Sequence, residues 1–256
     1  MRLAVSTLGL PGQTLAEAVA IAADAGCDGL ELRLHPDTGV HLALTEEERS
    51  AARELITARN LRVLALAGYA KVAAPGPDAP VIEEIVAGLR LAEAFGATGL
   101  RVFPGGSDVA AAVRRIRAAV RESPGPARIL VETHDEMPTG RDVARLLEAA
   151  AEPERTGAIW DLLHPWRHGE QPAQTLGALG GWLAYPQIKD AVSGADTTPV
   201  LLGTGSVPLD EAGARLRDAG YDGWVSLEWE RTWYPQVPPV TDVLPGARQW
   251  INRFEP

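Results

Sequence analysis

Short apolar runs alternate with longer amphipathic stretches along the whole chain. The runs are too short for helices and are bounded by turn residues, so they are predicted to be buried strands. We expect strands at residues 3–7, 29–33, 62–67, 99–103, 128–132, 157–161, 184–189 and 224–228. The amphipathic stretches predict helices at residues 14–25, 45–59, 80–95, 107–121, 139–150, 171–182, 209–219 and 240–253.

A turn with two glycines joins helix to strand at three places. Its copies are Gly26-Cys-Asp-Gly29, Gly96-Ala-Thr-Gly99 and Gly220-Tyr-Asp-Gly223. The first glycine suits the left-handed residue that ends a helix, and the second opens the turn into a strand. Thr45-Glu-Glu-Glu48 has the form of a capping box and marks the start of a helix.

Eight strand–helix units within 256 residues are the number found in a (β/α)8 barrel, an α/β fold. We therefore predict a single TIM-barrel domain over residues 1–256. The alternative is an open doubly wound sheet. It is disfavoured because the glycines of Leu8-Gly-Leu-Pro-Gly12, after the first strand, do not have the spacing of a dinucleotide-binding turn. No linker or low-complexity tract divides the chain.

The chain carries 34 acidic and 24 basic residues, a formal net charge of −10. This charge repels a polyanion, so nucleic acid is not expected as a partner. Arg114, Arg117 and Arg121 share one helical face among alanines, which we interpret as a solvated face.

No apolar stretch is long enough to span a bilayer, and no signal peptide is recognisable. The single cysteine, Cys27, excludes an internal disulfide and is expected to pack as a small hydrophobe in a cytoplasmic protein.

Polar residues concentrate where the last four predicted strands end. In a barrel these ends face one shared mouth, so Glu132, Asp161, Gln187 and Glu228 supply four candidate oxygen ligands there. Three carboxylates in one partly dry site repel one another, and without a cation at least one should keep its proton. Carboxylate and amide oxygens favour Mn²⁺ or Mg²⁺, with Zn²⁺ or Co²⁺ as alternatives. The competing interpretation is that salt bridges with Lys189, Arg33 or Arg101 satisfy these carboxylates.

The same segments resemble the xylose isomerase-like barrel superfamily of sugar isomerases and epimerases, which also includes endonuclease IV. The matching pieces are V-E-T-H-D (131–135), W-D-L-L-H-P-W-R-H-G-E (160–170), Q-I-K-D (187–190), L-G-T-G (202–205) and G-Y-D-G-W-V-S-L-E-W-E (220–230). In the second half of the chain the resemblance extends to these motifs. In the first half it concerns only the arrangement of strands and helices. It implies metal ligation at Glu132, Asp161, the position of Gln187, and Glu228.

The chain departs from the family at Gln187, where the family usually carries histidine. An amide oxygen still binds Mn²⁺ or Mg²⁺, but more weakly than imidazole binds a transition metal. A trinuclear zinc nuclease like endonuclease IV is not expected, because the further metal-binding histidines of that enzyme have no counterpart in residues 61–68 or 203–205.

The resemblance implies proton transfer between adjacent carbons of a sugar, sugar phosphate or keto-polyol through a metal-stabilised enediolate. We expect Glu132 and Glu228 to be the acid–base pair as well as ligands. Substrate contacts are expected from His164, Arg167, Lys189, His134, Glu31 and Trp166. Two alternatives stay open: a dehydratase or lyase acting on an inosose-type keto-polyol, and a non-catalytic sugar-binding barrel. The expected partner is a small carbohydrate substrate. No association with a membrane is expected, and the formation of a homodimer is left open.

Overall fold

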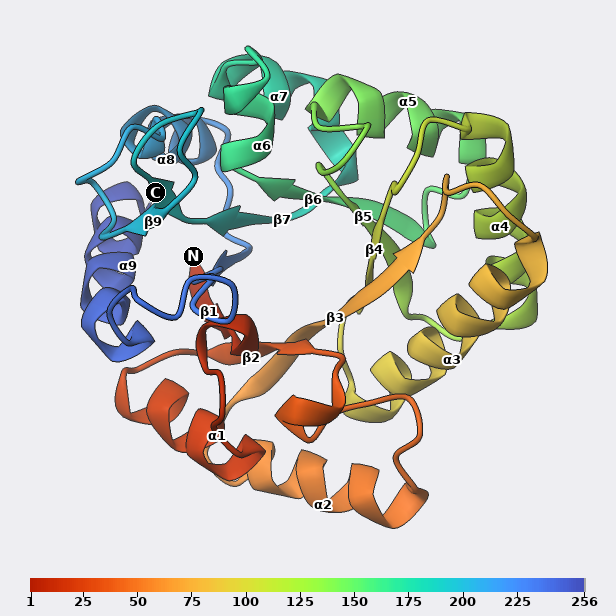
Figure 1. The fold of residues 1–256 in the computed structure, drawn as a ribbon, viewed down its shortest axis with the longest axis horizontal. Coiled ribbons are helices and arrows are strands. Elements are labelled where there is room, and N and C mark those ends of the chain that lie inside the picture. The colour runs from red at the N-terminus through yellow and green to blue at the C-terminus, as the bar shows by residue number, and fades with distance from the viewer. Residues whose placement is uncertain (256) are drawn as a thin grey trace.

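Parallel strands close into a barrel, and helices surround it (Figure 1). The computed structural model describes residues 1–255. Around the barrel the strands follow the order β1, β10, β7, β6, β5, β4, β3, β2. The predicted single (β/α)8 barrel is confirmed, and the open doubly wound sheet is excluded because β1 pairs with both β10 and β2.

The barrel strands lie close to the predicted positions. They are β1 (Arg2–Ser6), β2 (Gly29–Arg33), β3 (Arg62–Lys71), β4 (Gly99–Phe103), β5 (Arg128–Glu132), β6 (Thr156–Asp161), β7 (Leu183–Ile188) and β10 (Trp224–Leu227). The α-helices are α1 (Leu15–Asp24), α2 (Glu46–Thr57), α3 (Asp78–Phe95), α4 (Val109–Glu122), α5 (Gly140–Ala150), α6 (Leu163–Arg167), α7 (Pro172–Leu179), α8 (Leu209–Asp218) and α9 (Val240–Phe254). Short 3-10 helices are η1 (Thr7–Gly9), η2 (Pro36–Thr38) and η3 (Gly180–Trp182).

The predicted local signals work as expected. Gly26, Gly96 and Gly220 have φ angles of 71°, 67° and 67°, the left-handed conformation in which each helix ends. Thr45 accepts a hydrogen bond from the Glu48 backbone while the Glu48 carboxylate accepts from that of Thr45, which is the reciprocal capping box.

Three parts of the chain differ from the prediction. Strand β3 continues to Lys71, because its register against β4 shifts after Ala67 and such irregular pairing leaves no alternating pattern to recognise. The helix predicted at 171–182 ends at Leu179 and continues as η3. Helix α6 and a small antiparallel pair, β8 (Asp190–Ala191) and β9 (Pro199–Val200), occupy segments predicted as loops.

The inside of the barrel is apolar, and its base is closed by Trp224. The interior side chains are Ala4, Leu64, Ala65, Leu130, Ile159, Tyr185 and Trp224. The indole crosses the position of Gly29, where an added Cβ would lie 2.9 Å from ring atoms of Trp224. The polar residues are therefore gathered at the opposite end of the barrel, where the strands finish.

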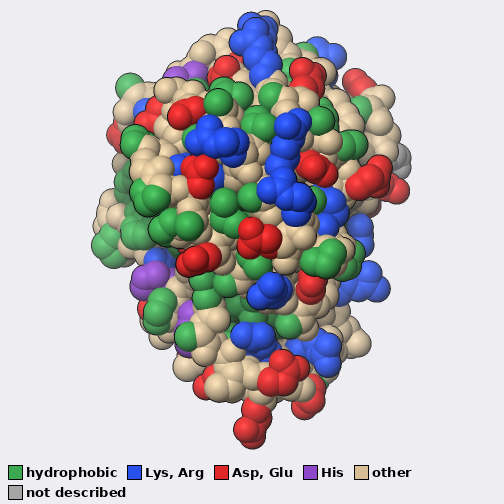
Figure 2. Space-filling view, turned by 90° about the vertical axis from the view of Figure 1, so that its right-hand side faces the viewer, with side chains coloured by type: hydrophobic (Ala, Val, Ile, Leu, Met, Phe, Trp, Pro, Cys, Tyr) green, Lys and Arg blue, Asp and Glu red, His purple; other side chains and the backbone are tan. Residues whose placement is uncertain are grey.

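Basic and acidic side chains are interspersed on the side of the molecule formed by α3 and α4, so this side shows no large patch of a single charge (Figure 2). Arg114 and Arg115 both bind Asp78, and Arg115 is only 1% exposed, so this arginine group is partly structural.

Cys27 is buried, as predicted. Among residues 1–255, no helix has the length and apolar character needed to cross a membrane.

Candidate active site

The predicted ligand positions converge at the carboxyl ends of four adjacent strands. Glu132 ends β5, Asp161 ends β6 opposite Gln187 of β7, and Glu228 follows β10. Carboxylate oxygens of Glu132, Asp161 and Glu228 lie within 4.8 Å of one another. All four side chains are buried, with at most 3% of any residue exposed. Residues that are far apart in the sequence thus form one compact group of oxygen donors.

Lys189 places its ammonium group among these carboxylates. Its Nζ lies 2.7 Å from Asp161 Oδ2 and 2.5 Å from both Glu228 Oε2 and Glu230 Oε1. Burial alone would lower the pKa of Lys189, but the surrounding carboxylates raise it well above its usual range. Lys189 is therefore a buried cation held by three anions.

Arg101 reaches the same group from β4. Its Nη1 lies 3.1 Å from Glu132 Oε2 and 3.2 Å from Glu228 Oε1, and its guanidinium stacks 4.5 Å from the ring centre of Phe103. The salt bridges anticipated as a competing interpretation therefore form with Arg101 and Lys189. Arg33 instead binds the carboxylate of Asp37.

The amide of Gln187 is oriented by two carboxylates. Its Nε2 donates to Glu31 Oε1 at 2.9 Å and to Glu228 Oε1 at 3.2 Å. Glu31 also accepts a hydrogen bond from Ser226 Oγ and is fully buried. The Gln187 Oε1 atom is buried and has no hydrogen-bond partner among the described residues. An oxygen without a partner at this depth is costly, and a cation would satisfy it.

The buried group carries more negative than positive charge. The carboxylates are Glu31, Glu132, Asp161, Glu228 and Glu230, while the cations are Arg101 and Lys189. Burial, and then the neighbouring Glu228, raise the pKa of Glu31 to about 7. Burial likewise raises the pKa of Glu132 well above its usual range. This agrees with the expectation that a carboxyl group here keeps its proton when no metal is bound.

The same donors fit a divalent metal ion. Besides Gln187 Oε1, the atoms Glu132 Oε2 and Asp161 Oδ2 are buried without a hydrogen bond, although they contact Arg101 and Lys189 as charges. Three such oxygens in a group with excess negative charge suit a hard or borderline divalent cation.

Two histidines form the adjacent wall. The rings of His134 and His164 are 4.3 Å apart, and both offer nitrogens within 4.8 Å of Glu132. His164 Nε2 lies 3.7 Å from Asp161 Oδ2. Burial, and then the Lys189 charge, lower the pKa of His164 well below its usual range, so its imidazole is neutral at pH 7.

Asp135 fixes the orientation of His134. One oxygen of its carboxylate lies 2.7 Å from His134 Nδ1, and the other accepts the backbone N–H of Gly105 at 3.0 Å. The backbone of Asp135 has a φ of 48°, which is uncommon outside glycine and places the carboxylate beside the imidazole.

The remaining predicted substrate contacts lie on α6. Trp166 packs partly buried against the core, whereas Arg167 is exposed. Neither side chain forms an ion pair or hydrogen bond with the carboxylate group among residues 1–255. The structure therefore brings His164, His134, Lys189 and Glu31 to the carboxylates and leaves Trp166 and Arg167 outside that group.

Several site residues had no role in the sequence prediction. Tyr69 accepts a hydrogen bond from Arg33 Nε at 2.6 Å and lies 6.0 Å from Phe103, ring centre to ring centre. Ser226 donates a hydrogen bond to Glu31, and Glu230 accepts one from Lys189. The available signal was the position of polar residues inside or shortly after an otherwise apolar strand, as with Ser226 in β10 and Glu230 after it.

The L-G-T-G motif shapes the loop beside the site. Asp190, directly after Lys189, accepts backbone N–H groups of Gly203 and Gly205 at 2.8 and 2.9 Å and of Val207 at 3.1 Å. A Cβ at Gly205 would lie 2.2 Å from the Ala191 carbonyl oxygen, so only glycine fits there. The motif has a structural explanation that involves no ligand.

A protein-family model described as xylose isomerase-like TIM barrel matches residues 19–254. A Streptomyces coelicolor protein named provisionally as a hydroxypyruvate isomerase is 36% identical over 91 residues. That match spans 35% of this chain and 30% of the relative.

Three solved structures share the architecture over nearly the whole of both chains. The probable 3-DHS dehydratase AsbF of Bacillus anthracis has a TM-score of 0.79 and 21% identity, covering 99% of each chain. The IOLI protein with a bound zinc atom has a TM-score of 0.81 and 16% identity over 98% of this chain and 97% of the other. D-psicose 3-epimerase of Clostridium cellulolyticum H10, solved with D-tagatose, has a TM-score of 0.79 and 12% identity over 99% and 97%. At these identities the likeness concerns the fold.

Proposed function

The chain belongs to the xylose isomerase-like TIM barrel family, and on that basis we propose that it is a divalent-metal-dependent isomerase or epimerase of a small polyhydroxy carbonyl compound. The observation that carries the proposal is the convergence of Glu132, Asp161 and Glu228 within 4.8 Å, with the buried amide of Gln187 in contact with Glu228. The match to a hydroxypyruvate isomerase and the fold of the epimerase and zinc-containing structures support the reaction class and the metal.

In this proposal Glu132, Asp161, Gln187 and Glu228 hold the ion. When bound, a divalent ion stabilises the negative charge that develops on the carbonyl oxygen of the substrate as the enediolate forms. Mn²⁺ or Mg²⁺ suits the all-oxygen set. Zn²⁺ or Co²⁺ is the alternative, since His134 and His164 lie beside Glu132.

Glu132 and Glu228 move the proton. Both contact Arg101 Nη1, at 3.1 and 3.2 Å, so the two carboxylates approach a common space from different strands. One takes the proton from the carbon next to the carbonyl, and the other returns a proton to the neighbouring carbon or to the opposite face.

The cationic and imidazole groups bind and orient the substrate. Lys189 and Arg101 stand close enough to the carboxylates to donate to substrate oxygens that replace part of those contacts. The neutral imidazole of His164 can donate one hydrogen bond and accept another, which suits a hydroxyl group. The rings of Phe103, His134 and His164 form one wall of the site, with ring centres 4.5 and 4.3 Å apart along the row.

A dehydratase is the second candidate, and the His134–Asp135 pair favours it. Asp135 holds an imidazole beside Glu132, where it can give a proton to a departing hydroxyl group. The same proton abstraction would then lead to loss of water instead of return of the proton.

Solvent deuterium exchange tests both candidates together. The protein is freed of metal with a chelator, loaded with Mn²⁺, Mg²⁺, Zn²⁺ or Co²⁺, and incubated in D₂O with ketoses, ketose phosphates, inososes and hydroxypyruvate. We expect deuterium at the carbon next to the carbonyl, with an isomer of unchanged skeleton for an isomerase or epimerase and a product lighter by one water for a dehydratase. The control is the Glu132→Gln/Glu228→Gln double variant, checked for folding by circular dichroism. Absence of both metal binding and exchange in the wild type would refute the proposal.

A further inference from the structure

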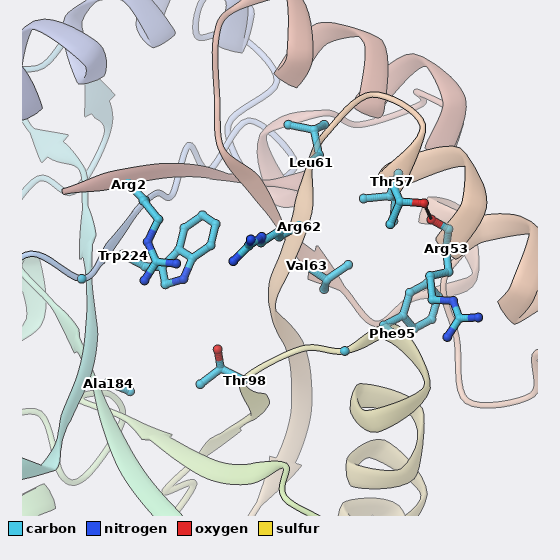
Figure 3. Close-up of a pocket in the computed structure, with 13 residues that line it drawn as sticks. Arg2, Arg53, Thr57, Leu61, Arg62, Val63, Phe95, Thr98, Ala184 and Trp224 are labelled. Atoms are coloured by element: carbon cyan, nitrogen blue, oxygen red, sulfur yellow. Dashed lines mark hydrogen bonds between the residues drawn. The ribbon is translucent and has the colours of Figure 1, made fainter.

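A pocket lies at the opposite end of the barrel from the carboxylate group. It has a volume of about 470 Å³ and opens where the strands begin (Figure 3). Its floor includes Trp224, and it lies between the barrel base and helices α2 and α3. The lining residues relevant here are Arg2, Arg53, Arg62, Phe95, Thr98 and Trp224.

Arginine dominates the charge of this pocket. Arg2 begins β1 and Arg62 begins β3, and both extend toward the middle of the opening beside Trp224, while Arg53 projects from α2 near Phe95 (Figure 3). None of the three forms an ion pair with any residue in the range 1–255. Some exposed arginines have partners, as Arg59 has in Asp24 and Arg253 in Asp210, whereas others, such as Arg121, also form no ion pair within residues 1–255.

What sets these three apart is that they line one pocket, in a chain that has ten more acidic than basic residues, 34 against 24. In such a protein a group of cations without anions produces a local positive potential that attracts small anions. A long polyanion would meet the negative charge of the rest of the molecule, so the potential selects for a small ligand.

The guanidinium of Arg2 lies over the indole of Trp224. It lies 4.5 Å from the centre of the Trp224 ring, a stacked position that leaves its N–H edge free to donate. Trp224 is itself fixed, since it is only 9% exposed and packs over Gly29. A donor fixed in this way loses little entropy when it binds an anion.

The other walls suit the body of a small organic molecule. Apolar side chains of Leu61, Val63 and Phe95 form one side, and the exposed Thr98 provides a hydroxyl group close to the base of the barrel. The pocket therefore combines a cationic end with an apolar wall and few other polar groups.

We propose that this pocket binds a small phosphorylated molecule, with the phosphate between Arg2 and Arg62. Guanidinium groups match phosphate oxygens in pairs of parallel hydrogen bonds. A phosphate monoester carries about −1.5 to −2 charges and three acceptor oxygens, so it uses two guanidinium groups more fully than a carboxylate does. Arg53 at the rim adds attraction at longer range. The proposal is independent of the activity proposed for the other end of the barrel.

Isothermal titration calorimetry with inorganic phosphate at low ionic strength tests the proposal. Wild-type protein should bind one phosphate per chain, and the Arg2→Gln/Arg62→Gln variant should bind it at least ~10-fold more weakly because the charge-assisted hydrogen bonds are lost. The matched control is Arg121→Gln, which removes an exposed arginine elsewhere and should bind phosphate like the wild type. Glu132→Gln should also leave phosphate binding unchanged, which separates this pocket from the carboxylate site.

Further titrations identify the class of ligand. A sugar phosphate should bind in the same variant-dependent way, whereas the parent sugar and acetate should not. The proposal is overturned if the wild type shows no saturable phosphate binding, if the double variant binds as well as the wild type, or if acetate binds as tightly as phosphate. Circular dichroism checks folding, and the single Arg62→Gln variant provides the test if the double variant does not fold.

Discussion

Gln187 donates its side-chain Nε2–H to Glu31 Oε1 at 2.9 Å. The Glu31 carboxylate accepts this hydrogen bond, while Gln187 Oε1 is buried without a hydrogen-bond partner among the described residues. Glu31 and Glu228 together hold the Gln187 amide in place by its nitrogen, at the position where the family usually carries histidine. The role of Gln187 as a metal ligand is part of the proposed function and is tested by substitution.

Replacing Gln187 by histidine should strengthen the binding of transition metals. Imidazole binds Zn²⁺ and Co²⁺ better than an amide oxygen does, and its second N–H can still donate to Glu31. We expect the Kd for Zn²⁺ to fall by about 10-fold or more, given that altered ligand shells shift affinity by ~10–100-fold. Competition with a chromogenic chelator on metal-free protein measures it. Gln187→Met, which fills the space without a donor oxygen, should bind metal more weakly than the wild type, and equal affinities in all three proteins would exclude Gln187 as a ligand.

Glu132→Gln and Glu228→Gln should each lower kcat by roughly 10²–10⁴-fold, the usual contribution of an acid–base group. Steady-state rates with saturating metal and substrate, on whichever compound shows deuterium exchange, provide the measurement. Glu230→Gln is the matched control, because Glu230 also contacts Lys189 but is the more exposed partner, at 17% of its side chain. A smaller loss is expected for this variant. Full activity of Glu132→Gln would contradict the assigned role.

Lys189→Met should destabilise the metal-free protein by about 3–5 kcal/mol, because removing one partner leaves buried carboxylates without their counter-charge. Urea unfolding with and without Mn²⁺ measures this, and bound Mn²⁺ should restore part of the loss. Lys71→Met changes the other lysine of the chain, which is exposed, and should alter stability little. Equal stability of Lys189→Met and the wild type without metal would show that the Lys189 contacts do not stabilise the fold.

Cys27 should resist thiol reagents in the native protein. Burial raises the pKa of its thiol from 9.0 to about 12, and only the thiolate reacts readily. At pH 8 we expect no labelling by a disulfide reagent until urea is added, and one thiol per chain afterwards. Because the unfolded chain ionises first, the folded state should also lose stability as the pH rises from about 9 toward 12. Rapid labelling of the native protein would contradict the burial of this residue.

The position of the site could be predicted from the sequence because it depends on strand ends alone. Glu132 and Asp161 are the last residues of β5 and β6, and parallel strands in a barrel finish at one mouth. The repeated helix–turn–strand units were sufficient to place those ends within a few residues. Neither conclusion required knowledge of which side chains touch.

The pairing of charges could not be predicted, because it depends on the stagger between strands. The register of β2 against β3 shifts at Glu31, and that of β3 against β4 shifts after Ala67. Arg101 reaches Glu228 across the barrel, whereas Arg33 binds Asp37 four residues further along the chain. The sequence identified these ions as candidates for pairing but contained no signal for their partners.

The contact between Arg101 and Glu228 crosses the full width of the barrel. Arg101 lies on β4 and Glu228 directly after β10, and these strands are four positions apart in a ring of eight, so they stand opposite each other. A cut in the loop between α4 and β5 would leave the guanidinium on one fragment and Glu132 and Glu228 on the other. Each half would then have to bury or hydrate charges that now neutralise one another, so this barrel cannot be divided into two self-sufficient halves even though its units repeat.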